Sequence, residues 1–119
     1  MEKVNVNEKL ALFHDYWNPR IAGELNGQHV KLVKFQGEFV WHKHDDEDEL
    51  FYVVDGSFEM EFRDRTIEIK EHEFIIVPKG VEHRPVAKKE VAIMLFEPAS
   101  TLNTGNVKND LTRNTLEVI

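Results

Sequence analysis

From residue 28 onward, hydrophobic and polar residues alternate along the chain, which is the pattern of strands with one buried face. The alternation is clearest where Phe58, Met60 and Phe62 are separated by glutamates. Comparable segments predict strands at residues 30–35, 39–42, 50–54, 58–62, 66–70, 74–77 and 91–96. About seven or eight short strands with frequent turns predict an all-β fold, either a closed barrel or a sandwich.

The first part of the chain, about residues 1–27, has a helical pattern instead. Its hydrophobic residues recur with the spacing of one helix face, namely Leu10, Phe13 and Trp17. Asn5 followed by Glu8 is typical of a capping box at a helix start. We expect a short amphipathic helix over about residues 8–17, with the first strand only after this N-terminal segment.

Two of the predicted strands, residues 50–54 and 91–96, are apolar on both faces. One face can fill a barrel interior, but the other must also be covered. The N-terminal helix could cover part of it, and a second copy of the chain could cover the rest. We therefore expect a homodimer. The alternative is that both strands are ordinary core strands covered within one chain.

The net charge of the chain is −7, from 15 lysines and arginines against 22 aspartates and glutamates, and this balance disfavours binding to nucleic acid. The absence of cysteine excludes disulfides, thiolate zinc sites and a cysteine nucleophile. No apolar run approaches the roughly 20 residues that span a bilayer, and the N-terminal residues lack the apolar stretch of a signal peptide. We expect a single domain over residues 1–119 that is soluble and cytoplasmic, with neither nucleic acid nor membrane as a partner.

Three histidines and one glutamate are the candidate functional residues of the chain. His42 and His44 lie two residues apart on a predicted strand, so both imidazoles should project from one face. Glu49 begins the next strand, and His83 follows a turn about forty residues later. A barrel can bring these segments together, and three imidazoles with one carboxylate suit a divalent transition metal. Taken alone, the histidine pair is equally consistent with simple surface placement.

This arrangement resembles the two sequence motifs of the cupin family. The first motif contains a glycine, a His-x-His pair, a glutamate and a second glycine, matched here by Gly37, His42, His44, Glu49 and Gly56. The second motif is Pro-x-Gly-x-x-His, matched here by Pro78, Gly80 and His83. His72 stands where a glycine often opens the second motif, and Ala87 where an asparagine often closes it. Neither position is a metal ligand in the family pattern.

The resemblance implies a small double-stranded β-helix, the jelly-roll or cupin barrel, over about residues 28–98. A short helix would precede it, and a polar tail over about residues 99–119, without a readable function, would follow it. The implied metal ligands are His42, His44, Glu49 and His83. The ion could be iron, manganese, nickel, zinc, cobalt or copper, since affinity order alone cannot choose among them. A purely structural metal is the alternative, and such a site is usually a closed tetrahedron around zinc.

We expect a small metal-dependent enzyme acting on a small organic molecule that chelates the metal. The family implies dioxygenase, isomerase or lyase chemistry at open coordination positions. No second acid–base residue is apparent near the motifs, which favours chemistry centred on the metal. The alternative is a non-catalytic, metal-containing module that binds a small molecule.

Two further features lie beside the histidine pair. The acidic residues at positions 45–48 could raise metal affinity, but we expect them to form a solvated loop. Phe39 and Trp41 have the opposite parity to the histidines, so we expect both to point away from the metal face.

Overall fold

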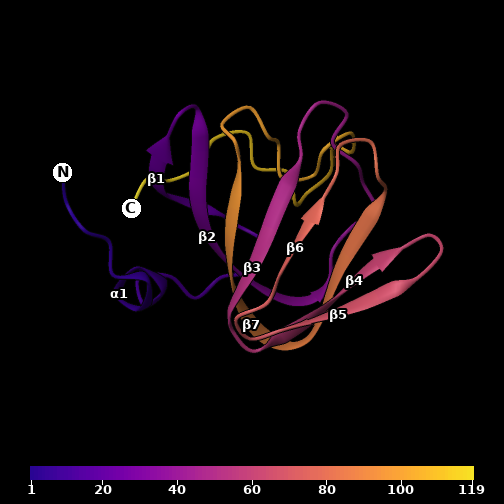
Figure 1. Ribbon diagram of the computed structural model, residues 1–119, viewed down its shortest axis with the longest axis horizontal. Coiled ribbons are helices and arrows are strands. Elements are labelled where there is room, and N and C mark those ends of the chain that lie inside the picture. The colour runs from indigo at the N-terminus through magenta and orange to yellow at the C-terminus, as the bar shows by residue number, and fades with distance from the viewer.

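The computed structural model describes residues 1–119 and confirms the expected mostly-β architecture with one short N-terminal helix (Figure 1). The elements are α1 (Val6–Leu10), β1 (Arg20–Leu25), β2 (Gln28–Glu38), β3 (Glu49–Asp55), β4 (Ser57–Phe62), β5 (Thr66–Lys70), β6 (Phe74–Val77) and β7 (His83–Pro98). All strand pairs are antiparallel. The protein contains no helix long and apolar enough to cross a membrane.

The long strand β7 joins the two parts of the sheet. The main strand order is β1-β2-β7-β3-β6, and the hairpin of β4 and β5 attaches through pairing of β4 with β7. The first residues of β7 pair with β4, and its later residues pair with β3. The side chains that point inward from these strands form the core, which includes Val33, Phe35, Phe51, Val53, Phe58, Met60, Val91, Ile93 and Leu95. The alternation seen in the sequence therefore reflects one buried face per strand.

The N-terminal segment differs from the prediction. The helix covers only Val6–Leu10, although Asn5 caps it as expected by accepting a hydrogen bond from the Glu8 N–H at 3.0 Å. The strand β1, which the prediction lacks, follows before residue 28. In a longer helix, Phe13 and Trp17 would lie on the same face. In the structure Phe13 packs on the outside of the sheet and Trp17 in its interior core, so the chain leaves the helix before them.

The predicted strand at residues 39–42 is wrong. After Glu38 the chain has no regular strand until Glu49, and only an isolated bridge joins His42 to His83. The backbone of this stretch makes only scattered hydrogen bonds, to the start of β7 at Phe39 and His42 and to a turn further along. The carbonyl of His44, for example, accepts a hydrogen bond from the Gly80 N–H at 2.7 Å. The stretch is therefore held by the start of β7, by the turn before β7 and by the C-terminal tail.

The C-terminal residues beyond β7 lie over the barrel (Figure 1). Figure 1 shows this segment, in yellow, crossing the upper end of the sheet and returning to β1. At its end Val118 forms a parallel bridge with Ile21. The tail is thus attached at both ends of its path and covers the end of the barrel where the candidate site lies.

Candidate metal centre

The structure brings together the four side chains that the sequence singles out, His42, His44, Glu49 and His83. All four are buried, and each offers a ligand atom within 4.8 Å of the others. The His42–His83 bridge aligns the two motif segments through backbone hydrogen bonds of 3.1 and 2.9 Å. Residues about forty positions apart in the sequence therefore share one site because the barrel pairs their backbones.

Two of the histidines have one ring nitrogen already engaged. The Nδ1 atom of His42 lies 2.9 Å from the carbonyl oxygen of Val40, and that of His83 lies 2.9 Å from the carbonyl oxygen of Val81. A carbonyl only accepts, so each Nδ1 carries the proton and donates it. Each Nε2 therefore has a free lone pair, which is the form of histidine that binds a metal.

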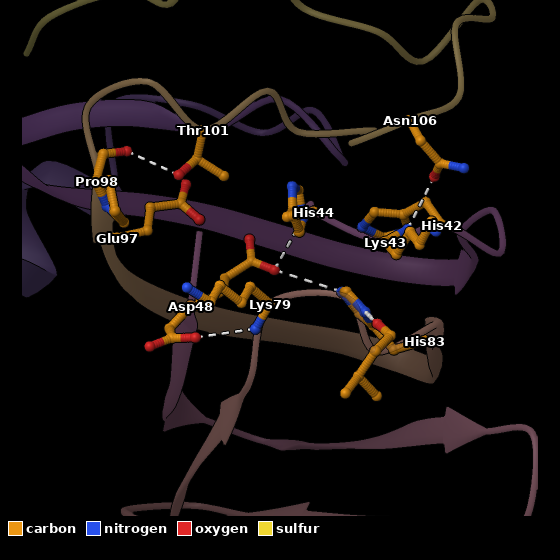
Figure 2. A network of polar contacts seen from close by, with 12 residues as sticks. His42, Lys43, His44, Asp48, Lys79, His83, Glu97, Pro98, Thr101 and Asn106 are labelled. Carbon is orange, nitrogen blue, oxygen red and sulfur yellow. Dashed lines mark hydrogen bonds and ion pairs between the residues drawn. The ribbon is translucent and has the colours of Figure 1, made fainter. Parts of the chain in front are cut away.

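Three buried polar atoms in the centre of the site have no hydrogen-bond partner: His44 Nε2, His83 Nε2 and Glu49 Oε1. The two nitrogens lie 3.2 and 3.4 Å from the Glu49 oxygen (Figure 2). Buried polar atoms without partners are rare because they lose hydration without compensation. A cation among them would satisfy all three, so these residues fit a metal ion.

The electrostatics of the site favour the deprotonated forms that metal binding needs. Burial, followed by the proximity of His83, lowers the pKa of His42 from 6.5 to about 4. Burial opposes ionisation of Glu49, but the imidazoles of His44 and His83 outweigh it and lower the pKa of Glu49 well below its usual range. A neutral His42 and an ionised Glu49 are therefore present together at neutral pH.

Comparison with known proteins identifies the family. The family model of the cupin domain matches residues 29–97, which is more than half of the chain. The protein is a cupin. A cupin-2 domain protein from Shewanella frigidimarina is 48% identical and superposes with a TM-score of 0.79, covering 80% of this chain and 93% of that one. A protein from Neisseria meningitidis is 33% identical with a TM-score of 0.76, covering 82% of this chain and all of that one.

Among curated proteins, this cupin is similar to the uncharacterized protein YdbB of Bacillus subtilis, with 42% identity over 62 residues. The match covers 51% of this chain and 55% of YdbB, so it spans about half the length of that relative. These comparisons show the family and the fold. They do not name an activity for this cupin.

The interior of this cupin holds a second buried carboxyl group that the sequence analysis missed. Glu97 lies on β7 beside Glu49, and its Oε1 atom accepts a hydrogen bond from the Nζ atom of Lys31 at 2.7 Å. Burial and then the charge of Glu49 raise the pKa of Glu97 well above its usual range. The sequence does carry a signal for this residue. Glu97 lies two positions after Leu95, which is also buried, so both side chains point to the same face of the strand.

A small cavity of about 30 Å³ lies beside the candidate ligands, and both His42 and Glu49 line it. It has room for roughly two water molecules. Glu97 also lines the cavity, and its aromatic walls are Trp17, Phe35, Phe39 and Phe51. A molecule in the cavity would therefore contact polar side chains, including His42, Glu49 and Glu97, and a mostly apolar wall.

The orientation predicted for Phe39 is wrong, whereas that of Trp41 agrees with the structure. The ring of Phe39 lies in the core, 5.3 Å from the ring of His42 and 4.8 Å from that of Trp17. Trp41 instead lies outside the core, under the guanidinium of Arg63 at 3.9 Å. The parity argument fails at Phe39 because this stretch is not a regular strand.

The acidic loop at residues 45–48 faces solvent for most of its length, as predicted. Its last residue also has a local role, because Asp48 Oδ1 accepts a hydrogen bond from the Lys79 N–H at 2.9 Å (Figure 2). Gly80, the next residue, donates its N–H to the carbonyl of His44. The turn of the second motif is therefore tied to the loop that carries the first.

Proposed function

We propose that this cupin binds one divalent transition metal ion and acts as a metal-dependent enzyme on a small organic molecule that chelates the metal. The ligands would be His42, His44, Glu49 and His83. The observation that carries the proposal is the convergence of their four buried ligand atoms beside a cavity that two of them line. The unpartnered atoms of His44, Glu49 and His83 are the part of the site that a cation would satisfy.

The donor set of neutral imidazoles and one carboxylate suits iron, manganese, nickel, zinc, cobalt or copper. When bound, such an ion supplies a Lewis acid with coordination positions open to a substrate. The chain contributes the orientation of its ligands, because Val40 and Val81 each fix one imidazole through Nδ1. Dioxygenase, isomerase and lyase reactions are the classes that membership of the family suggests.

Glu97 favours an enzyme over the alternative of a non-catalytic binding module. The sequence offered no acid–base partner for a reaction, and that absence was the feature in favour of a binding module. Glu97 lines the cavity next to Glu49, so its carboxyl group is placed to exchange a proton with a molecule bound there. The narrow cavity restricts such a molecule to a few atoms unless the walls move.

The first experiment is elemental mass spectrometry of untagged protein purified without added metal. We expect about one transition metal ion per chain in the wild type and its loss in His44→Ala. His14→Ala, which changes an exposed histidine outside the site, is the matched control and should retain the metal. Wild-type protein that is empty and stays empty after anaerobic incubation with each metal would contradict the proposal.

Turnover separates the enzyme from the binding module. Loaded protein is incubated with small hydroxy acids, keto acids and diols, and the mixtures are followed for product formation and for ligand-induced stabilisation. Conversion that is lost in His44→Ala supports the enzyme. Saturable stabilisation without chemical change for any loaded metal supports the binding module instead.

We also propose that a second copy of the chain covers the outer face of the sheet. Leu50 lies between Ile76 and Phe96 in register across β6, β3 and β7, and all three are apolar. Ile76 and the neighbouring Phe74 are 53% and 59% exposed. The N-terminal segment covers a different part of the outer sheet, near Leu32. The uncovered apolar face supports a homodimer.

A further inference from the structure

Residues 103–106 of the polar tail lie directly against the segment that carries two candidate ligands. The Asn106 N–H donates a hydrogen bond to the carbonyl of Lys43 at 3.0 Å. In return, the Lys43 N–H donates to Asn106 Oδ1 at 2.9 Å (Figure 2). Lys43 is the residue between His42 and His44, and Asn106 binds both its N–H and its carbonyl group.

Gly105 brings the tail closer to this segment than any other residue could. A Cβ atom at position 105 would lie 2.2 Å from the carbonyl oxygen of Lys43 and 3.2 Å from Cδ2 of His42. The φ angle of Gly105 is +55°, which also favours glycine. The contact therefore requires a residue without a side chain, since any Cβ atom would collide with the Lys43 carbonyl and crowd the ring of His42.

The 103–106 segment is itself fixed from behind. The side chain of Asn103 donates to the carbonyl of Leu111 and accepts from the N–H of Arg113, each at 2.8 Å. Thr104 is fully buried, and its hydroxyl lies 2.6 Å from that of Thr112. Asn103 also lines the cavity beside the candidate ligands. The segment is thus a fixed wall of the site and not a loose tail.

We propose that Gly105 and Asn106 are positioning residues, which set the backbone at Lys43 and thereby place the imidazoles of His42 and His44 for metal binding. The inference rests on the proposed metal site. Groups that orient metal ligands affect affinity without touching the metal, and their loss typically weakens binding about 10- to 100-fold. The 103–106 segment acts one step further out, through the backbone, so the lower end of that range is expected.

The test compares Asn106→Ala with Asn109→Ala. Asn109 is a matched control because it is also exposed and also accepts a backbone N–H, that of Leu111 at 2.9 Å, within the same tail. The probe is cobalt(II), whose affinity is measured by competition with a chelator and whose visible absorption reports coordination geometry. Asn106→Ala should bind cobalt(II) about tenfold more weakly with an altered spectrum. Asn109→Ala should match the wild type, and Asn106→Asp, which keeps the acceptor oxygen, should restore the wild-type spectrum.

A second pair of variants tests the close approach at Gly105. Gly105→Ala should weaken cobalt(II) binding by more than tenfold, since the new methyl group would displace the Lys43 carbonyl. Gly27→Ala is the matched control, because Gly27 has a φ of +77° but a Cβ atom added there would meet nothing within 4 Å. Gly27→Ala also places an alanine at a positive φ but without the clash, so its cobalt(II) affinity should remain that of the wild type.

The outcomes distinguish this inference from the metal proposal. If Asn106→Ala and Asn109→Ala bind cobalt(II) equally and give one spectrum, the positioning role is overturned while the metal site stands. If the wild type binds no cobalt(II), the metal proposal fails, and the imidazole NMR resonances of the metal-free protein decide the inference. Resonances of His42 and His44 that move in Asn106→Ala but not in Asn109→Ala support positioning, and resonances that move in neither overturn it.

Discussion

The Nζ atom of Lys31 lies 2.7 Å from Oε1 of Glu97, and each of these side chains is only 2% exposed. Two ionisable groups removed from water in this way lose hydration energy that their mutual attraction offsets only in part. The pair therefore adds little net stability, but removing one partner leaves a buried polar group uncompensated.

We expect Glu97→Leu to lower the free energy of unfolding by about 3–5 kcal/mol, because the Lys31 ammonium would lose its partner inside the protein. The double variant Lys31→Met/Glu97→Leu should recover most of that loss. Chemical denaturation of the metal-free proteins measures both. Lys70→Met, which breaks an exposed contact with Glu68, is the control and should change stability by about 1 kcal/mol or less. A double variant no more stable than Glu97→Leu would contradict the prediction.

The contribution of His42 to the stability of the metal-free protein should fall as the pH decreases from about 6.5 to about 4. His42 has a pKa of about 4 in the folded protein against 6.5 ordinarily, because burial disfavours its charged form. Between these values the unfolded chain binds the extra proton, so acid favours unfolding. Above pH 6.5, this pKa difference of His42 contributes about 3 kcal/mol to the free energy of unfolding.

Denaturation curves at several pH values check this expectation. His42→Asn should flatten the dependence in that pH range, whereas His14→Asn, at an exposed position, should leave it unchanged. Equal slopes in His42→Asn and the wild type would show that other groups cause the dependence.

Addition of a transition metal should raise the unfolding midpoint, since binding to the folded state alone stabilises it. At a free concentration of about 100 times the dissociation constant, the gain is about 2.7 kcal/mol. Zinc and cobalt should act through the imidazoles, and magnesium, which prefers oxygen ligands, should have little effect. Thermal unfolding with each ion measures the shift. A shift retained in full by His44→Ala would place the binding elsewhere.

Light scattering coupled to size exclusion tests the proposed dimer. Ile76→Lys should shift the protein toward a monomer, because the charge would lie in the apolar face shared with Leu50 and Phe96. Leu12→Lys is the control, since Leu12 is 64% exposed outside that face. A wild type that is monomeric at micromolar concentration would contradict the proposal.

Local pattern alone was enough to predict several parts of this protein. The alternation of Phe58, Met60 and Phe62 determined a strand and its buried face, since a period of two depends on the backbone and not on a partner. The same holds for the helix cap at Asn5, which involves residues three positions apart. The spacing of the two motifs likewise singled out the four residues that the structure brings together, because residue type and spacing are properties of the sequence itself.

Tertiary structure decided what depends on distant residues. Phe39 faces the cavity because the chain leaves strand geometry after Glu38, where its hydrogen-bond partner is the distant Pro85 of β7. Glu97 contacts Lys31, which is 66 positions away in the sequence, and Asn106 contacts Lys43, which is 63 positions away. Such contacts have no local signal, since they form only when the barrel closes and the tail crosses its end. The sequence by itself thus determined most of the strands and the candidate ligands, whereas the closed fold decided β1, the path of residues 39–48 and what surrounds the ligands.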